Sequence, residues 1–338
     1  MSAPFSGIAT DISIQREATL GGAGSGSVFS LCGKVKVTQG VEFAGKDKTV
    51  NVWREQSGVF HAGKFYTGTL EIELGLNAVI ELLLGTFFEL EATESVSDGG
   101  GSEVFGEGGA LFGEGSGLFG EPATLTSYTL RPLRLKGIKS CKLGLDFLGH
   151  SFLLEGVTID SLRFDMRRNQ VPKLNVVYKA LTRESVSVPA LADATSIDVR
   201  RVHHANTACT FDAAELSNLT EISLSFNNVK LPAAYGSNKQ PSKFRAEPFT
   251  MAGQLVEYYS ANAKLPAAIA AQTEHSYVVI FSDPQATSRK IEIRFPRLNF
   301  NDGMPDAASR DDLIARANFS AVMPTAQESD GLKIILVA

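Results

Sequence analysis

The side chains that most often carry catalysis occur in this chain, but their spacing forms no catalytic or metal-binding constellation. The serines lie in no GxSxG turn, and the five histidines lie in no HExxH frame. His203 and His204 are the best metal candidate. Adjacent residues on a strand point to opposite faces, so this pair cannot chelate one ion without a turn, and a surface strand is favoured. The sequence therefore predicts no catalytic residue, no cofactor, no metal site and no enzyme activity.

Two further patterns imitate ligand-binding motifs. Residues 115–120 match the GxGxxG pattern that holds a pyrophosphate at a helix start, but Glu121 and Pro122 cannot open that helix. Several aspartates near the C-terminus could suggest a calcium site, yet their spacing lacks the EF-hand order, which favours solvated turns. These aspartates are Asp302, Asp306, Asp311 and Asp312.

The charge of the chain is unevenly distributed, although the net charge is only −5. Residues 65–130 contain eleven acidic side chains and no lysine or arginine, whereas residues 131–182 contain ten basic and four acidic ones. In the basic block, charged residues alternate with leucine and glycine, which is typical of a solvated strand face. The alternative is that the acidic and basic blocks attract each other when two copies associate.

Residues 65–93 contain the pattern around which the rest of the chain is organised. A strand with Gly68 precedes a helix over residues 76–87, whose apolar side chains share one face, and a second strand follows. A fainter copy occupies residues 249–281, with Gly253 in its first strand and a helix that Pro266 confines to a late start. The two units indicate an internal duplication, although short matches also arise by chance.

The remaining segments predict short strands, with four exceptions. Residues 1–27 end in GGAGSGS, so we expect a flexible N-terminal arm. Residues 41–52 are expected to form a polar hairpin that turns at residues 45–48. Residues 95–122 are rich in glycine and phenylalanine and resist regular structure, which predicts an exposed insertion joining two strands. Residues 309–314 are expected to form a short helical turn.

Length and composition limit the class of protein. The chain has 338 residues, which is enough for two domains, and its 43% hydrophobic content is typical of a soluble globular protein. Cys32, Cys141 and Cys209 are widely spaced and fit reduced thiols. No signal peptide or membrane-length apolar run occurs, so we expect the protein to be cytoplasmic when made, without a membrane anchor. The strand pattern predicts an all-β-dominated fold with a few helices.

Several segments together resemble one protein family. Residues 152–179 read FLLEGVTIDSLRFDMRRNQVPKLNVVYK, a strand and return strand similar to those of the major tail tube proteins of long-tailed bacteriophages. Residues 290–299 (KIEIRFPRLN), 317–322 (ANFSAV) and 331–336 (GLKIIL) resemble the final strands of that family in order and spacing. The resemblance covers most of residues 28–338.

The resemblance implies both a fold and a function. The family fold is a β-sandwich or barrel with a flanking helix, and rings of six such domains stack into a hollow tube through which the genome leaves the head. Residues 28–165, with the insertion at 95–122, and residues 166–338 would form two similar tube-like domains, so that a trimer makes a pseudo-sixfold ring. The implied partners are further copies, the tape measure and terminator proteins, and genomic DNA that passes without specific binding. The alternative is a baseplate, decoration or host-recognition module of the virion tail.

The resemblance also assigns expectations to two groups of charged residues. The polar residues 40–64 are expected to reach into the neighbouring ring, since long loops without an apolar face stay ordered only with a partner. The residues expected in this stacking loop are Lys46, Asp47, Lys48 and Arg54. Acidic side chains that alternate with apolar ones are expected to line the lumen, against the reading that they solvate an outer face. These carboxylates are Glu71, Glu73, Glu89 and Glu91.

Overall fold

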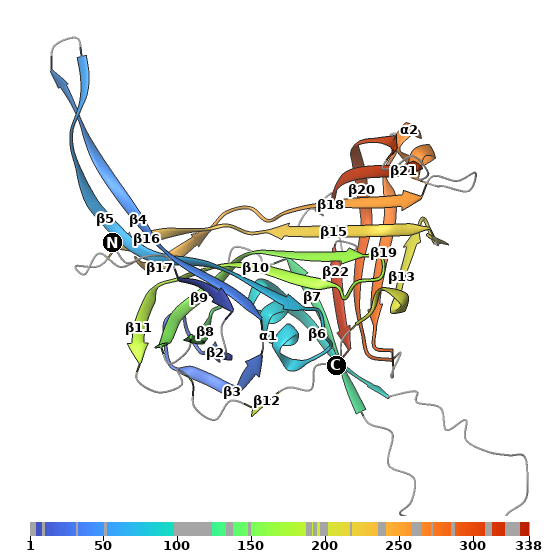
Figure 1. Cartoon of the computed structure of the whole chain (residues 1–338), viewed down its shortest axis with the longest axis horizontal. Helices are drawn as coiled ribbons and strands as arrows, with labels where there is room; N and C mark the ends of the chain where they lie inside the picture. Colours follow the sequence, from blue (N-terminus) through green and yellow to red (C-terminus); the bar gives the residue numbers. More distant parts are fainter. Residues whose placement is uncertain are drawn as a thin grey trace, which may run out of the picture.

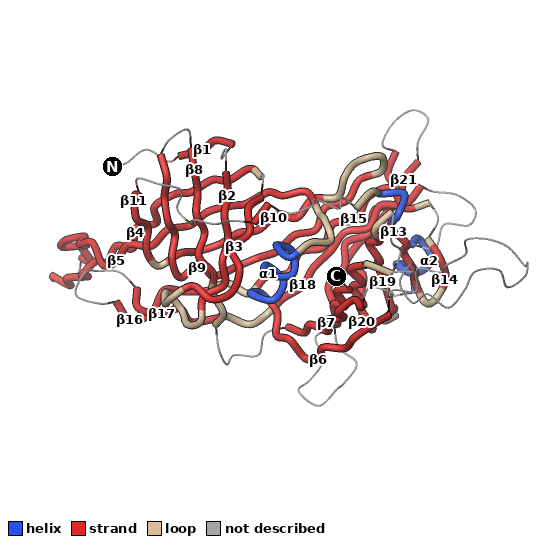
Figure 2. Tube along the Cα trace, turned by 90° about the horizontal axis from the view of Figure 1, so that it is seen from below, coloured by secondary structure: helices blue, strands red, loops and turns tan. Residues whose placement is uncertain are grey.

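The computed structural model confirms an all-β-dominated fold with few helices. Figure 2 shows how strands dominate the part of the chain that the structure describes. The described residues are 5–8, 11–31, 33–50, 53–97, 124–132, 138–147, 150–186, 191, 195–196, 202–216, 218–235, 241–258, 265–271, 273–284, 288–307, 313–321 and 332–337.

A long antiparallel sheet runs through the whole molecule (Figure 1). In spatial order its strands are β1 (Phe5–Ile8), β4 (Lys34–Val50), β5 (Trp53–Glu73), β10 (Lys173–Ala180), β9 (His150–Arg167), β15 (Leu219–Asn227), β18 (Thr250–Tyr258), β21 (Leu313–Ala321) and β20 (Lys290–Ala307). The pairing of β9 with β15 joins the N-terminal strands to the C-terminal ones. One hydrogen-bonded surface therefore connects the two halves of the chain.

β9 belongs to two sheets because it bends near its middle. Residues 158–167 pair with β10 and β15 in the long sheet, whereas residues 150–157 pair with other strands. Gly156 has φ +62°, and a Cβ atom there would lie 2.6 Å from Leu181 Cδ1, so the bend requires glycine. The second sheet contains β8 (Cys141–Phe147), β11 (Thr182–Val186), β2 (Asp11–Glu17), β3 (Gly24–Leu31) and β12 (Thr195–Ser196).

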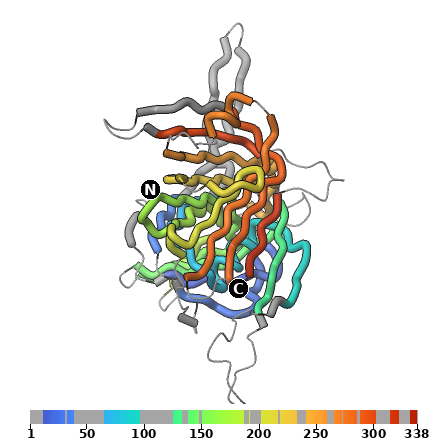
Figure 3. Tube along the Cα trace, turned by 90° about the vertical axis from the view of Figure 1, so that its right-hand side faces the viewer, coloured from blue at the N-terminus to red at the C-terminus, as the bar shows by residue number. Residues whose placement is uncertain are grey.

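β20 is likewise shared between two sets of partners. Residues 298–307 pair with β21, whereas the preceding residues 290–298 pair with strands that run side by side in orange and red in Figure 3. These and the strands beyond them are β19 (His275–Ser282), β22 (Lys333–Val337), β13 (Thr207–Phe211), β14 (Ala214–Glu215), β7 (Thr124–Pro132) and β6 (Phe88–Ser97). β16 (Lys230–Tyr235) and β17 (Pro241–Ala246) form a separate hairpin.

The helix predicted over residues 76–87 is confirmed as α1 (Ala78–Phe87). Asn77 caps it, because the Asn77 side chain accepts hydrogen bonds from the backbone N–H groups of Val79 and Ile80, each at 3.1 Å. The fainter copy contains α2 (Leu265–Ala271), which begins one residue before Pro266, as expected for a proline in the first turn. Thus both helices follow a glycine-containing strand of the long sheet.

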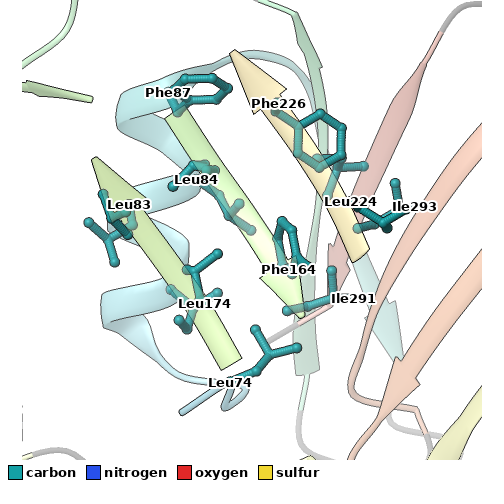
Figure 4. Close-up of a cluster of buried hydrophobic side chains, with 14 of the residues drawn as sticks. Leu74, Leu83, Leu84, Phe87, Phe164, Leu174, Leu224, Phe226, Ile291 and Ile293 are labelled. Carbon is teal, nitrogen blue, oxygen red and sulfur yellow. The ribbon is translucent and has the colours of Figure 1, made fainter. Parts of the chain in front are cut away.

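The core lies between α1 and the inner face of the long sheet. Figure 4 shows Leu83, Leu84 and Phe87 of α1 directed toward side chains from β9, β10 and β15. Phe164 and Phe226 come from adjacent strands, and their ring centroids lie 5.9 Å apart in an edge-to-face arrangement. Because residues of both halves contribute to this cluster, the core is continuous across the β9–β15 pairing.

The expected flexible arm at residues 1–27 is wrong for the part that the structure describes. Ile12 and Ile14 in β2 are fully buried in the core. The Glu17 carboxylate is also buried and accepts hydrogen bonds from the Ser140 hydroxyl at 2.5 Å and from the backbone N–H of Gly156 at 2.8 Å. Gly21 and Gly22 lie in the β2–β3 turn, and Gly24 and Gly26 already belong to β3, which pairs with β2.

The long polar hairpin exists, but its turn is not at residues 45–48. β4 continues to Val50 and β5 begins at Trp53, with a two-residue connection between them. Bulges at residues 45–47 and 42–43 let both strands continue past the glycine. Residues 309–312 of the expected helical turn lie outside the described residues, and Leu313 and Ile314 already belong to β21.

Strand pairings cross the boundary expected between residues 165 and 166. That boundary falls inside β9, which ends at Arg167, and β9 pairs with β15 of the C-terminal half. The last strand, β22, returns to pair with β7 of the N-terminal half. The insertion expected at residues 95–122 does join two antiparallel strands, since Ser97 of β6 lies opposite Thr124 of β7, while residues 98–123 are outside the described ranges.

Candidate assembly surfaces

The β4–β5 hairpin leaves the long sheet and extends beyond the rest of the molecule at the upper left of Figure 1. β10 accompanies β5 only as far as Tyr66, and β1 accompanies β4 only as far as Val37. Beyond these points the two strands pair only with each other among the described strands. The expected stacking residues lie near the far end of this arm, three in β4 and one in β5: Lys46, Asp47, Lys48 and Arg54.

The outer face of the long sheet is charged because buried and more exposed side chains alternate along β5, β10 and residues 161–167 of β9. On β5, Leu70 and Ile72 are buried while Glu71 and Glu73 lie on the opposite face. Glu71 contacts Lys173 of β10 at 2.8 Å, and the hydrogen bond from Lys173 lowers the pKa of the Glu71 carboxyl. This face therefore carries the two carboxylates in the alternation that the sequence predicted.

This outer face is not uniformly acidic, however. β9 carries both signs of charge on this face, since Arg163 Nε lies 2.8 Å from Asp165 Oδ1. Arg167 of β9 lies 4.0 Å from Glu221 of β15, across the joint between the two halves. The acidic and basic blocks of the sequence thus pair within one chain, because their strands are neighbours. Lys173 with Glu71 is one such pair.

Glu89 and Glu91 lie elsewhere. Both are exposed on β6, which pairs only with β7 among the described strands, and Glu91 forms an ion pair with Arg131 of β7. Leu90, which the alternation placed toward the core, is 47% exposed. The structure therefore does not bring the candidate lumen carboxylates together: two lie on the long sheet and two on β6.

A buried charge cluster of Asp160, Lys179 and Lys230 was not predicted from the sequence. Asp160 accepts the backbone N–H of Lys230 at 2.9 Å and lies 2.8 Å from the Lys179 ammonium. Lys230 Nζ donates to the carbonyl of Ile159 at 2.7 Å and lies 5.0 Å from the ring centre of Phe87. Burial lowers the pKa of Lys230 to about 8. Asp160 interrupts an apolar strand run, which was the available signal. The cluster fastens β16 to the bend of β9.

Two of the histidines have a structural role. His203 and His204 do not lie on a surface strand as expected: His203 caps a short 3-10 turn over His204–Asn206 by accepting the N–H of Ala205. Within the described ranges, no group of three or more His, Cys, Asp or Glu side chains could hold a metal ion. These two histidines therefore have a local structural explanation.

His275 has neighbours that superficially imitate a charge-relay system. Its Nδ1 lies 2.7 Å from Asp212 and its Nε2 lies 3.2 Å from the Thr273 hydroxyl. The threonine is two residues from the histidine, and Asp212 also accepts the backbone N–H of Ser276 at 2.8 Å. Since Asp212 has φ +46°, in the turn between β13 and β14, these contacts fasten that turn to β19.

Comparison with known families gives a match that covers most of the chain. A family model described as phage tail tube protein matches residues 47–321. The chain belongs to the phage tail tube protein family. The resemblance found in the sequence is thereby confirmed, and the protein is a structural protein of the phage tail. No curated protein matches the chain. Among the described residues, no helix has the length and apolar character needed to span a membrane.

Proposed function

We propose that this protein assembles into rings that stack into the hollow tail tube through which DNA leaves the phage head. The observation that carries the proposal is the long sheet, whose inner face buries the core while its outer face carries charges. Such a sheet suits a tube wall, because its polar face can line a water-filled channel while its apolar face stays dry. Membership of the tail tube family supports the same conclusion.

The tube-like unit occurs twice in the chain under this proposal. β5 with α1 would correspond to β18 with α2. Gly68 of β5 lies opposite Tyr178, and Gly253 of β18 lies opposite Phe319. At each glycine a Cβ atom would lie 2.3 Å from the aromatic ring of the neighbouring strand. The bulges also agree, since Asp160 of β9 and Asn301 of β20 are each skipped in the ladder to the following strand. Matched bulges support common descent of the two units.

Two units per chain favour a trimeric ring with pseudo-sixfold symmetry. Within the chain, the first unit meets the second through β9 and β15, which pair over residues 161–167 and 221–227. A ring of three chains would need three further joints of the same kind. Copies of this chain are therefore the principal partner, and the tape measure and terminator proteins are the partners proposed at the tube's interior and end.

The lumen proposal now rests on the outer face of the long sheet. Replacing Glu71 and Glu73 with lysine should impair genome ejection, because the new ammonium groups would join Lys173 and Lys34 in a cluster that binds DNA phosphates. We expect release about tenfold slower at low salt and nearly normal release at high salt, since salt screens exposed charges. DNA release from purified virions measures the effect.

The matched control replaces Glu89 and Glu91 with lysine. These carboxylates are also exposed, but they lie on β6 rather than on the long sheet, so their reversal should leave release unchanged if the outer face of that sheet lines the lumen. Equal rates for the two double variants would contradict the placement of Glu71 and Glu73 in the lumen.

Electron microscopy of concentrated purified protein tests the proposed assembly directly. Rods or stacked rings in negative stain are expected for a tube protein. Compact monomers at every concentration would instead favour a baseplate, decoration or host-recognition module, in which the β4–β5 hairpin or the β6–β7 hairpin would contact a different partner.

A further inference from the structure

The outer edge of β4 carries a strand that is held by few contacts. β1 pairs with residues 34–37 of β4, with Ser6 opposite Lys36. On its other edge β4 pairs with β5 along almost its whole length. A ladder of four residues on a sheet edge contributes little stability, so β1 can leave β4 without unfolding the sheet.

β15 occupies the place in the second unit that β4 occupies in the first. Val37 of β4 lies opposite Gly68, and Leu224 of β15 lies opposite Gly253. The outer edge of β15, however, is covered by residues 161–167 of β9 rather than by a terminal strand. The edge of β4 in the first unit is thus covered by the short strand β1, whereas the equivalent edge of β15 in the second unit is covered by β9 of the first unit.

β20 is the counterpart of β9, since both strands bend from one set of partners to another. Residues 302–307 of β20 pair with β21 on one edge. Among the strands that the structure describes, none pairs with the other edge of residues 302–307. The open edge of residues 302–307, at one end of the long sheet, is therefore the equivalent of the β9 edge that pairs with β15. At the other end of the sheet, the β4 edge equivalent to that of β15 is covered by β1.

We infer that β1 is a removable cover: residues 302–307 of one copy pair with the β4 edge of the next copy and displace β1. This inference rests on the proposed ring assembly and deepens it. The β9–β15 joint supplies the register, in which Ile222 lies opposite Met166. Transferring that register places Ala307 opposite Val35 and Asp306 opposite Lys36. The lysine and aspartate positions are complementary in charge, and the new ladder is longer than the one β1 provides.

Cross-linking tests the register in assembled protein. Lys36→Cys combined with Asp306→Cys should form a disulfide between copies, giving covalent dimers and trimers on non-reducing gels. The control pairs Lys36→Cys with Met304→Cys, which is two residues out of register and too distant to bridge. All variants carry Cys32→Ser, and the remaining cysteines, Cys141 and Cys209, are buried.

A second variant tests the covering role of β1. Ser6→Cys with Lys36→Cys should lock β1 onto β4 when oxidised, because these residues are directly opposite each other. We expect the oxidised protein to remain monomeric and tube yield to fall at least about tenfold, with recovery on reduction. Removing residues 2–8 should have the opposite effect and lower the concentration needed for tubes about tenfold.

The outcomes separate this inference from the proposed function. Tubes that form equally well from the oxidised and reduced Ser6→Cys/Lys36→Cys protein would overturn the covering role. Suppose that the wild-type protein forms tubes, but the Lys36→Cys/Asp306→Cys protein cross-links no more than the Lys36→Cys/Met304→Cys control. That result would overturn the register while leaving the tube function intact. Wild-type protein that forms neither rings nor tubes at any concentration would instead refute the proposed function itself.

Discussion

Shortening the β4–β5 hairpin should abolish tube growth and leave a folded protein. Replacing residues 44–60 with Asn-Gly joins Phe43 to His61, which already lie opposite each other, through a turn that suits a two-residue hairpin. The shortened arm lacks Lys46, Asp47, Lys48 and Arg54. The arm pairs only with itself beyond Tyr66, so its loss removes no contact to the long sheet. Rings without stacked tubes are expected in negative stain, with an unchanged thermal midpoint.

A full-length control separates reach from charge. Replacing the charged residues of the arm with alanine keeps its length and removes its ionic contacts: Lys46, Asp47, Lys48 and Arg54. Tubes that persist in this variant at low salt but not in the shortened one would show that the arm acts through its reach. Normal tubes from the shortened protein would contradict the assignment of the arm to ring stacking.

Asp160→Ala should cause the largest loss of stability of any single substitution considered. Lys230 is buried and Lys179 is partly buried, and both contact Asp160 or groups beside it. Removing the carboxylate leaves their charges without an anion, which costs about 3 kcal/mol of unfolding free energy. Chemical denaturation measures the loss. The matched control is Asp165→Ala on the same strand, whose ion pair with Arg163 is exposed and is worth less than about 1 kcal/mol.

The same cluster predicts a dependence on pH. Burial lowers the pKa of Lys230 to about 8 in the folded protein, from a value of 10.5 for an unburied lysine. Between these values the unfolded chain binds more protons than the folded one, so the free energy of unfolding should rise as pH increases from 8. Lys230→Met should remove this rise. A wild-type stability that is flat over this range would contradict the burial of a charged Lys230.

Much of the local structure follows from neighbouring residues, and these parts were predictable. α1 forms where its apolar side chains recur at helical spacing after Asn77, and the capping hydrogen bonds come from the first turn itself. The alternation on β5 correctly separated Glu71 from Leu70, since successive side chains of any strand point to opposite faces. Neither inference needs information about distant parts of the chain.

The pairing of strands depends on residues far apart in the sequence, and the alternation of polar and apolar residues does not predict it. Glu71 and Glu89 sit in similar alternating segments, yet one joins the long sheet and the other an exposed hairpin.

The sequence by itself thus determined that the chain is rich in strands, contains helices after its two glycine-bearing strands and resembles tail tube proteins. Only the tertiary structure decided that Glu17 is buried, because Ser140 and Gly156 satisfy its carboxylate from more than a hundred residues away. It also decided that the two halves share one sheet. Strand pairing is a contact between distant segments, and local sequence constrains the face of a strand but not its partner.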